Sequence, residues 1–175
     1  TDVFPLNIGY IASYCKKLFG NDVEITLFKY VDAIDDAVSK NPPDILAMSN
    51  YAWCQRIDRE ISKIFSKLNP NGIVVWGGPN FPLDLPSQEK FFRENPVIDI
   101  YVPVEGEIGF GNIVKKSLEV ESKDEFRNKM LEEPIDGCIT RLKNGKLQYS
   151  TAPIRTKQLD EIPSPYTSGL LDQFF

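Results

Sequence analysis

The run that decides the fold is Ile73-Val74-Val75-Trp76-Gly77-Gly78-Pro79-Asn80. Four apolar residues in succession predict a short strand that is buried on both faces, and this strand leads directly into two glycines. Residues 44–49 form a similar run upstream, also expected to be covered on both faces, and residues 98–102 form another strand downstream. Strands separated by helices of ordinary size predict an α/β fold with a doubly wound, mostly parallel sheet that carries helices on both faces.

The clearest helix lies over residues 53–68, between the first two of these strands. Its apolar residues recur at helical spacing and predict one buried stripe, formed by Ile57, Ile61, Ile64, Phe65 and Leu68. Residues 9–19 and 32–40 predict two earlier helices in the same way.

The start of the chain predicts an unusual sheet. Residues 23–28 alternate in the manner of a strand. A doubly wound sheet should begin with a strand, but Phe4-Pro5-Leu6-Asn7 already resembles the loop that leads into the first helix. We therefore expect the first, central strand to lie before Thr1, as though truncated. Its loss would expose strand edges and favour self-association between chains.

The pattern changes after about residue 120. Residues 122–131 predict a short helix, and two strand-like runs flank Asn144-Gly145, which is the strongest short signal of a β-hairpin. In the last stretch Pro163 and Pro165 favour an extended backbone, which ends in exposed apolar residues. We therefore divide the chain into an α/β domain over residues 1–120, a helix-and-hairpin appendage over residues 121–152, and a linker over residues 153–175 towards an absent domain.

Composition excludes several classes of partner. The chain has 175 residues, 42% of them hydrophobic and 26% charged, which is typical of one globular domain. Its net charge of −5 provides no basic surface, so we expect no nucleic-acid partner. No apolar run approaches the roughly 20 residues needed to cross a bilayer, so we expect no membrane partner either.

Histidine is absent from the sequence, which excludes Ser-His-Asp and Cys-His nucleophilic sites and all histidine-containing metal sites. The three cysteines, Cys15, Cys54 and Cys138, are far apart and form no CxxC pair, so we interpret them as small buried side chains. Their odd number, without a secretory signal, favours a reducing compartment and hence the cytoplasm.

Ligands of open α/β sheets bind outside the carboxyl ends of the strands, so the residues that follow each strand are the candidates for a site. Ser49 and Asn50 can bond the polar edge of a ligand, although Ser49 can equally cap the next helix. Gly77 and Gly78 indicate either a turn that needs positive φ or the close approach of a bulky ligand. The aromatic residues of these loops are Tyr51, Trp53, Phe81 and Tyr101, and they favour either core packing or a wall for a large flat ligand.

Glu105-Gly106-Glu107 lies at the start of a predicted helix. The carboxylates there complement the helix dipole, or they accept hydrogen bonds from ligand hydroxyls or amides. No nucleophile or metal partner stands nearby, so we predict no catalytic residue and no metal ligand on this chain. The phosphate-binding patterns GxGxxG and GxxxxGK[ST] are also absent.

Several motifs, taken in order, resemble the N-terminal cobalamin-binding domain of cobalamin-dependent radical S-adenosylmethionine enzymes. They are Pro5-Leu6-Asn7-Ile8-Gly9-Tyr10-Ile11-Ala12-Ser13-Tyr14, Asp44-Ile45-Leu46-Ala47-Met48-Ser49, Val75-Trp76-Gly77-Gly78-Pro79, Gly106-Glu107 and the tail Leu159-Asp160-Glu161-Ile162-Pro163-Ser164-Pro165-Tyr166. The resemblance implies a flavodoxin-like fold with cobalamin bound at the carboxyl edge of the sheet. The candidate cofactor-binding residues are Asn7, Ser49, Asn50, Tyr51, Gly77, Gly78, Pro79, Asn80, Glu105, Gly106 and Glu107.

Two departures from related families limit what this chain does alone. The DxHxxG motif of other cobalamin domains is absent, so the resemblance implies cobalamin without a histidine axial ligand. The CxxxCxxC motif that holds a [4Fe–4S] cluster is absent as well. S-adenosylmethionine and the cluster would therefore belong to a radical domain outside this chain, which would be its partner. The complete protein would be a radical S-adenosylmethionine methyltransferase or a related enzyme.

Two other hypotheses remain open at this stage. The chain could be a degenerate docking domain that has lost its cofactor, with its crevice plugged by Tyr51, Trp53 and Phe81. It could also be a small enzyme that uses Glu105 and Glu107. The cobalamin hypothesis requires that the candidate residues meet at one edge of the sheet and leave a hollow there.

Overall fold

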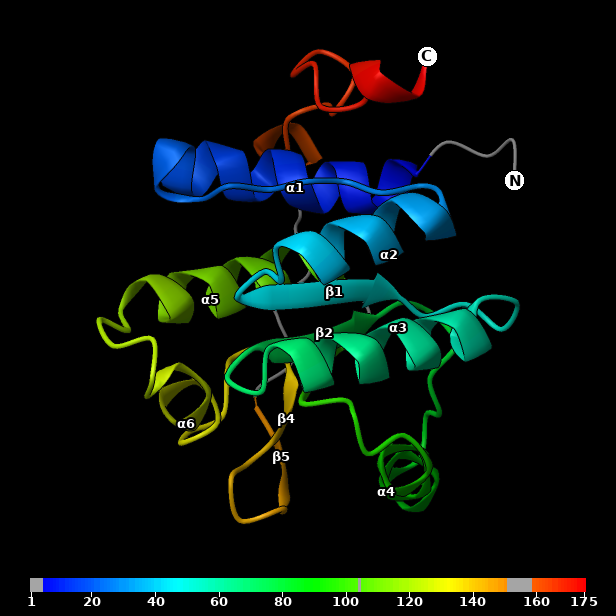
Figure 1. The fold of residues 1–175 in the computed structure, drawn as a ribbon, viewed down its shortest axis with the longest axis vertical. Coiled ribbons are helices and arrows are strands. Elements are labelled where there is room, and N and C mark those ends of the chain that lie inside the picture. Colours follow the sequence, from blue (N-terminus) through cyan, green and yellow to red (C-terminus); the bar gives the residue numbers. More distant parts are fainter. Residues whose placement is uncertain (1–4, 104, 151–158) are drawn as a thin grey trace.

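The sheet has the predicted α/β architecture. The computed structural model describes residues 5–103, 105–150 and 159–175 (Figure 1). Five strands lie in the order β1-β2-β3-β4-β5: β1 is Ile45–Ser49, β2 is Ile73–Gly77, β3 is Ile100–Val102, β4 is Ile139–Arg141 and β5 is Leu147–Tyr149. The first three strands are parallel, and the predicted hairpin extends the same sheet in the antiparallel direction.

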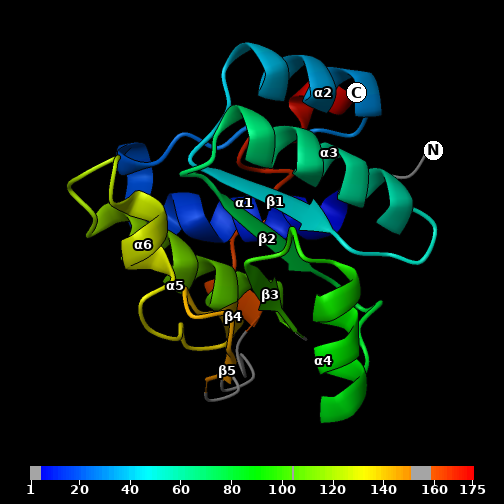
Figure 2. The same ribbon diagram turned by 60° about the horizontal axis from the view of Figure 1, so that its bottom comes forward.

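Helices cover both faces of the sheet, as predicted. The helices are α1 Leu6–Phe19, α2 Val31–Lys40, α3 Gln55–Leu68, α4 Leu85–Glu94, α5 Gly106–Leu118 and α6 Phe126–Met130, with short 3-10 helices at Gly20–Asp22, Leu159–Glu161 and Asp172–Phe174. Buried side chains of α2, α3 and α4 pack with Trp76 on one face. Those of α5 and α6 pack with Val75 on the other face, and Figure 2 shows α3 and α5 on opposite sides of the sheet.

Helix α1 lies close against α5 (Figure 1). Two glycines of α5 allow this approach. A Cβ atom at Gly106 would lie 2.6 Å from Cδ1 of Ile11, and one at Gly111 would lie 3.2 Å from the Tyr14 ring. These contacts hold the first two turns of α5, which follow β3, against the second and third turns of α1.

The buried stripe of α3 is rotated from the predicted one. Its buried residues are Asp58, Ile61, Ser62 and Phe65, whereas Ile57, Ile64 and Leu68 are each about 40–50% exposed. The indole nitrogen of Trp76 donates a hydrogen bond to the Ser62 hydroxyl at 3.0 Å, which draws this polar face of the helix towards the sheet.

The predicted strand over residues 23–28 is wrong. These residues form no strand, and Leu27 packs against Ala12 of α1 instead. A strand needs a hydrogen-bonded neighbour, and β1 is an edge strand that pairs only with β2 in the described part of the chain. The prediction that β1 is covered on both faces is also wrong, because Leu46 is buried but Ala47 is exposed. The strand expected before Thr1 stays a prediction.

The prediction of an extended backbone in the last stretch is wrong where the structure describes it. That this stretch is a linker stays a prediction. Residues 159–175, which we call the strap, form turns and two 3-10 helices that pack on α1. Leu171 is 0% exposed, so the apolar end is not left wholly in solvent as expected. Residues 151–158 lie outside the described part.

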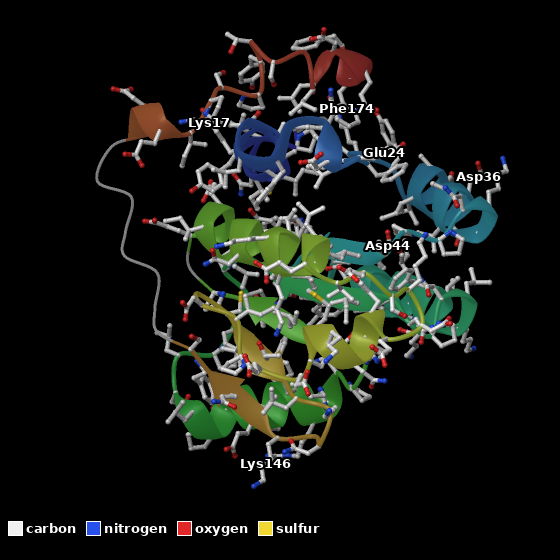
Figure 3. The ribbon with its side chains drawn as sticks, turned by 90° about the vertical axis from the view of Figure 1, so that its left-hand side faces the viewer. Lys17, Glu24, Asp36, Asp44, Lys146 and Phe174 are labelled. Carbon is white, nitrogen blue, oxygen red and sulfur yellow. The ribbon has the colours of Figure 1, made fainter. Side chains whose placement is uncertain are left out.

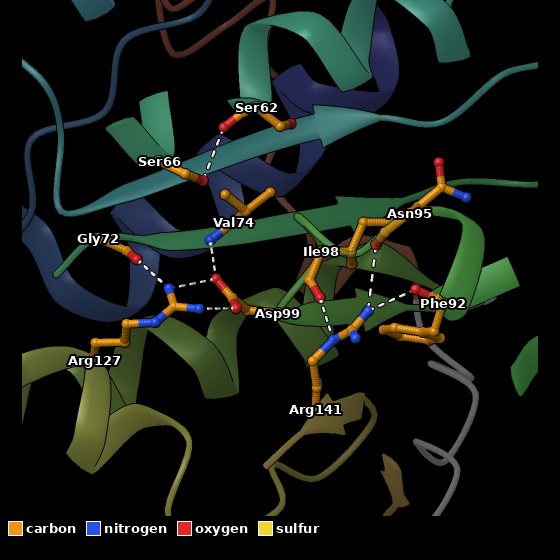
Figure 4. Close-up of polar contacts among 10 residues, drawn as sticks. All are labelled: Ser62, Ser66, Gly72, Val74, Phe92, Asn95, Ile98, Asp99, Arg127 and Arg141. Carbon is orange, nitrogen blue, oxygen red and sulfur yellow. Dashed lines mark hydrogen bonds and ion pairs between the residues drawn. The ribbon is translucent and has the colours of Figure 1, made fainter. Parts of the chain in front are cut away.

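A group of charged residues joins the hairpin and α6 to the amino ends of the strands. Asp99, directly before β3, accepts hydrogen bonds from the Val74 N–H and from both terminal nitrogens of Arg127 (Figure 4). Arg127 also donates to the Gly72 carbonyl at 2.7 Å. Arg141 of β4 donates to the carbonyls of Ile98, Phe92 and Asn95. We call Asp99, Arg127 and Arg141 the amino-edge lock.

Burial raises the pKa of Asp99, and the adjacent Arg127 guanidinium opposes that shift. A buried carboxylate of this kind is tolerated only when it is paired and hydrogen-bonded. The lock therefore makes the predicted appendage an integral part of the sheet.

Candidate functional site

The candidate residues gather at the carboxyl edge of β1, β2 and β3. Ser49 lies beside Gly77 in the sheet, and Gly77 lies beside Val102, so the three strand ends are level. The side-chain amide of Asn7, in the first turn of α1, donates a hydrogen bond to the Tyr51 hydroxyl. The structure thus brings the β1–α3 loop and the start of α1 together at the edge where the sequence places a ligand.

Asn50 stabilises this edge from within. It is 0% exposed, and its N–H donates to the Gly77 carbonyl at 2.6 Å. Its side-chain amide donates to the Asn80 carbonyl at 2.6 Å and to the Tyr101 hydroxyl at 3.1 Å. Asn80 donates back to the Asn50 side-chain oxygen at 3.3 Å. The amide of Asn50 is therefore committed to holding two loops together, and we call these contacts the Asn50 network.

The two glycines serve the same network. Gly78 has φ of +125°, and a Cβ atom there would lie 2.8 Å from the Asn50 carbonyl oxygen. A Cβ atom at Gly77 would lie 3.2 Å from the Val102 carbonyl oxygen. Positive φ and the approach of neighbouring backbone account for the pair, which favours the turn interpretation over close approach by a ligand.

The four aromatic residues of the loops divide into two pairs. Phe81 and Tyr101 stack at 3.9 Å between ring centroids and belong to the core, where Phe81 also contacts Phe91. Tyr51 and Trp53 stack at 4.8 Å on the outside, and Trp53 is 77% exposed. The edge is therefore not plugged by Trp53, and it presents an aromatic surface.

Ser49 does not cap α3, because the N-cap residue is Cys54. Its carbonyl accepts a hydrogen bond from the Cys54 thiol at 3.0 Å, while its half-buried hydroxyl forms no hydrogen bond with the described residues. Ser49 thus keeps a polar group available at the edge. Pro79 is exposed beyond the glycine turn.

Asp58 is a buried group that the sequence patterns missed. It is 4% exposed and accepts a hydrogen bond from the Cys54 thiol at 3.1 Å. Burial raises the pKa of Asp58 to about 6 and that of Cys54 to about 11. Its spacing could have predicted its burial: Asp58 precedes Ile61 by three residues and Ser62 by four, so it lies on the same face of the helix. A buried carboxyl group thereby lies directly beneath the Tyr51–Trp53 loop.

The Glu105–Glu107 segment begins α5. Glu105 is the N-cap residue but forms no capping hydrogen bond through its side chain, and Gly106 packs on Ile11. Glu107 is half-buried and lines a cavity of about 460 Å³. The other residues that line this cavity are Tyr10, Asp160, Ile162, Pro163 and Ser164.

A second cavity of about 370 Å³ lies beside the glycine turn. Its lining residues are Gln55, Pro79, Asn80, Phe81, Pro82 and Phe91. Cavities of about 300–1,000 Å³ hold drug-sized ligands. A tetrapyrrole with its side arms is much larger than such a ligand, so neither cavity could enclose one. A ligand of that size would lie across the open edge, with only its side arms in cavities.

Two curated proteins match nearly the whole chain. The carbapenam methyltransferase 2-(S-pantetheinyl)-carbapenam-3-carboxylate methyltransferase of Streptantibioticus cattleyicolor is 29% identical over 174 residues, which is 96% of this chain and 24% of the relative. The cobalamin-dependent radical SAM methyltransferase TokK of Streptomyces tokunonensis is 30% identical over 172 residues, again 96% of this chain and 24% of the relative. The resemblance predicted from the sequence is confirmed.

A solved structure shows the same fold. The cobalamin-dependent S-adenosylmethionine radical enzyme OxsB, whose structure holds aqua-cobalamin and S-adenosylmethionine, has a TM-score of 0.63 with 20% identity. The match covers 97% of this chain and 22% of OxsB. This chain thus spans about a quarter of the length of the proteins it resembles, and no family model matches it.

None of the helices in the described part of the chain combines the length and the apolar character that a membrane crossing requires.

Proposed function

We propose that this chain is the cobalamin-binding part of a radical S-adenosylmethionine enzyme, and that cobalamin lies across the carboxyl edge of β1, β2 and β3. The observation that carries the proposal is the similarity of nearly the whole chain to such methyltransferases. The gathering of the candidate residues at one open edge supports it.

The residues at this edge fit the chemistry of a corrin. Cobalamin is a flat macrocycle that carries amide side arms around its rim. Tyr51 and Trp53 offer an exposed aromatic surface, and the Ser49 hydroxyl and Glu107 carboxylate are available to hydrogen-bond with amides. Asn50, Gly77, Gly78 and Asn80 would act as positioning residues beneath this surface. Bound cobalamin would supply a cobalt centre able to carry a methyl group.

The absence of histidine bears on the cobalt. With no histidine in the sequence, the cobalt would receive no imidazole ligand from this chain. S-adenosylmethionine and the [4Fe–4S] cluster would be held by a radical domain that covers the open edge, and the whole protein would transfer methyl groups as its relatives do.

Retention of hydroxocobalamin tests the proposal. The chain, alone and within the longer protein proposed here, is mixed with hydroxocobalamin and freed of unbound corrin by gel filtration. We expect the corrin absorption to co-elute with protein. If neither form retains corrin, the proposal is wrong and the docking-domain hypothesis is favoured.

A pair of variants tests the place of binding. Trp53→Ser removes an exposed aromatic surface at the carboxyl edge, and we expect about tenfold weaker binding, since a buried aromatic contact is worth about 1.5 kcal/mol. Leu118→Ser removes an exposed apolar residue at the opposite end of α5 and should leave the affinity unchanged. Equal losses in both variants would contradict the assignment of the edge.

Self-association of the chain and its cellular location also stay proposals. The free edge of β1 would pair with another copy of the chain if no further strand covers it, and light scattering that shows a monomer at high concentration would exclude this. The three free cysteines suit the cytoplasmic location predicted from the sequence.

A further inference from the structure

The strap is held on α1 by close packing as well as by polar contacts. A Cβ atom at Gly9 would lie 3.0 Å from Cβ of Pro165 and 3.2 Å from Cδ2 of Leu171. Ser13 and Ser168 share a hydrogen bond of 3.3 Å, and the Lys17 ammonium donates to the Glu161 carbonyl at 2.6 Å. Figure 3 shows the strap arching over α1 from the side of Lys17 to the side of Phe174.

The strap also forms one wall of the 460 Å³ cavity. Its residues 160–164 supply four of the six lining residues, and Tyr10 and Glu107 supply the opposite wall. The cavity therefore exists only while the strap is docked on α1.

This cavity adjoins the proposed cofactor edge. Tyr10 is one turn along α1 from Asn7, whose side chain contacts Tyr51 at the edge. Glu107 lies in the first turn of α5, just beyond the end of β3. The side chains of Tyr10 and Glu107 form no hydrogen bond or ion pair with the described residues, so their polar groups are available to a ligand.

We infer that the strap is part of the cofactor site, with an amide-bearing side arm of the corrin entering the cavity between Tyr10, Glu107 and the strap. This inference rests on the proposed function. The carboxylates of Glu107 and Asp160 accept hydrogen bonds from neutral amide N–H groups. The same carboxylates would repel the phosphate of the nucleotide arm, so an amide arm suits this cavity and a phosphate does not.

A coupling between corrin and strap follows. If the corrin binds better when the strap is docked, the docked strap is stabilised by the corrin to the same extent. Corrin binding would thereby fix the strap in its position on α1.

Hydrogen exchange on the unaltered chain tests the coupling without any substitution. The probe is hydroxocobalamin at saturation, and the readout is exchange of the strap amides, including those of Asp172 and Phe174 that donate within the strap. We expect exchange to slow by about fivefold or more. Strap exchange that is unchanged while corrin is bound would overturn the inference and leave the proposed function intact, whereas absence of corrin binding would overturn both.

Two matched substitutions in the strap test the reverse direction. Leu171→Asp places a charge against α1, and we expect it to weaken hydroxocobalamin binding by about five- to 100-fold. Gln173→Asp places the same charge at an exposed position of the strap and should bind as the unaltered chain does. Equal affinity in Leu171→Asp and the unaltered chain would contradict the inference.

A third substitution identifies the arm. Glu107→Gln keeps the size of the side chain but weakens its acceptor, so we expect about three- to tenfold weaker binding if an amide arm enters. Removal of the charge would instead strengthen binding if a phosphate enters, and that result would overturn the amide assignment. Glu119→Gln, at the exposed far end of α5, is the control and should have no effect.

Discussion

The two edges of the sheet differ in whether their polar side chains are hydrogen-bonded within the chain. At the amino edge, Asp99 is buried and paired with Arg127, and Arg141 is bonded to three backbone carbonyls. At the carboxyl edge, the Asn50 network is equally satisfied, but Ser49 and Glu107 outside it keep polar groups that no described residue uses.

This difference separates stability from binding. A buried polar group must be bonded within the chain, because leaving it unpaired costs about 1–3 kcal/mol. A half-exposed group avoids that cost through water and can exchange the water for a ligand. We therefore expect substitutions at the amino edge to change the free energy of unfolding, and substitutions in the outer part of the carboxyl edge to change ligand affinity.

The largest expected effect is on the amino-edge lock. Asp99→Ala removes the acceptor of the Val74 N–H and leaves the buried end of Arg127 with the Gly72 carbonyl in place of a carboxylate, and we expect the free energy of unfolding to fall by about 3 kcal/mol. Urea unfolding measures this change. Asp124→Ala removes an exposed carboxylate before α6 and should change stability by less than about 0.5 kcal/mol. A loss below about 1 kcal/mol in Asp99→Ala would contradict the importance of the lock.

The next effect concerns the glycine turn, Gly77-Gly78, which we expect to contribute both to stability and to ligand binding. Gly78→Ala forces a side chain into positive φ and against the Asn50 carbonyl, and we expect a loss of about 2 kcal/mol together with weaker corrin binding. Gly77→Ala has only a 3.2 Å contact to accommodate and should lose less. If Gly77→Ala proves the more damaging in urea unfolding and corrin titration, the account of this turn is wrong.

A third effect is the pH dependence set by Asp58. Its pKa of about 6 lies above the ordinary value, so the folded state binds this proton more tightly than the unfolded state. This group's contribution therefore makes the chain less stable as pH rises from about 4 to 6, by about 1–3 kcal/mol in total.

Thermal unfolding between pH 4 and 8 tests this contribution by comparison of variants. Asp58→Asn should remove the pH-dependent difference and be more stable than the unaltered chain at pH 7.5. Glu60→Gln, an exposed carboxylate on the same helix, is the control. An Asp58→Asn variant that is less stable than the unaltered chain at pH 7.5 would contradict the burial argument.

The sequence predicted the elements whose local signal and tertiary setting agree. Residues 73–76 form a buried strand because an uninterrupted apolar run is buried wherever it lies, and Asn144-Gly145 closes a hairpin because its turn is local. The strand predicted over residues 23–28 was wrong, because alternating apolar and polar residues also occur in an extended segment that packs along a helix. The prediction of the buried stripe of α3 failed because a long-range hydrogen bond, from Trp76 to Ser62, sets which face of the helix is buried.

The sequence predicted where the candidate site residues lie better than it predicted what each of them does. Strand order alone places Ser49, Gly77 and Glu107 near the carboxyl edge. It could not show that the Asn50 side chain points inward, or that Gly78 leaves space for the Asn50 carbonyl. It also could not show that the strap lies close to Tyr10. These features depend on contacts between residues far apart in the sequence, on which local patterns carry no information.

The most direct test of the account is to locate cobalt in crystals of the chain grown with hydroxocobalamin, using anomalous scattering. We predict a cobalt peak at the carboxyl edge, over the surface formed by Tyr51 and Trp53. A peak beside Arg127 and Arg141 at the amino edge, or well-ordered crystals without cobalt from a protein solution that retains no corrin, would contradict the central claim.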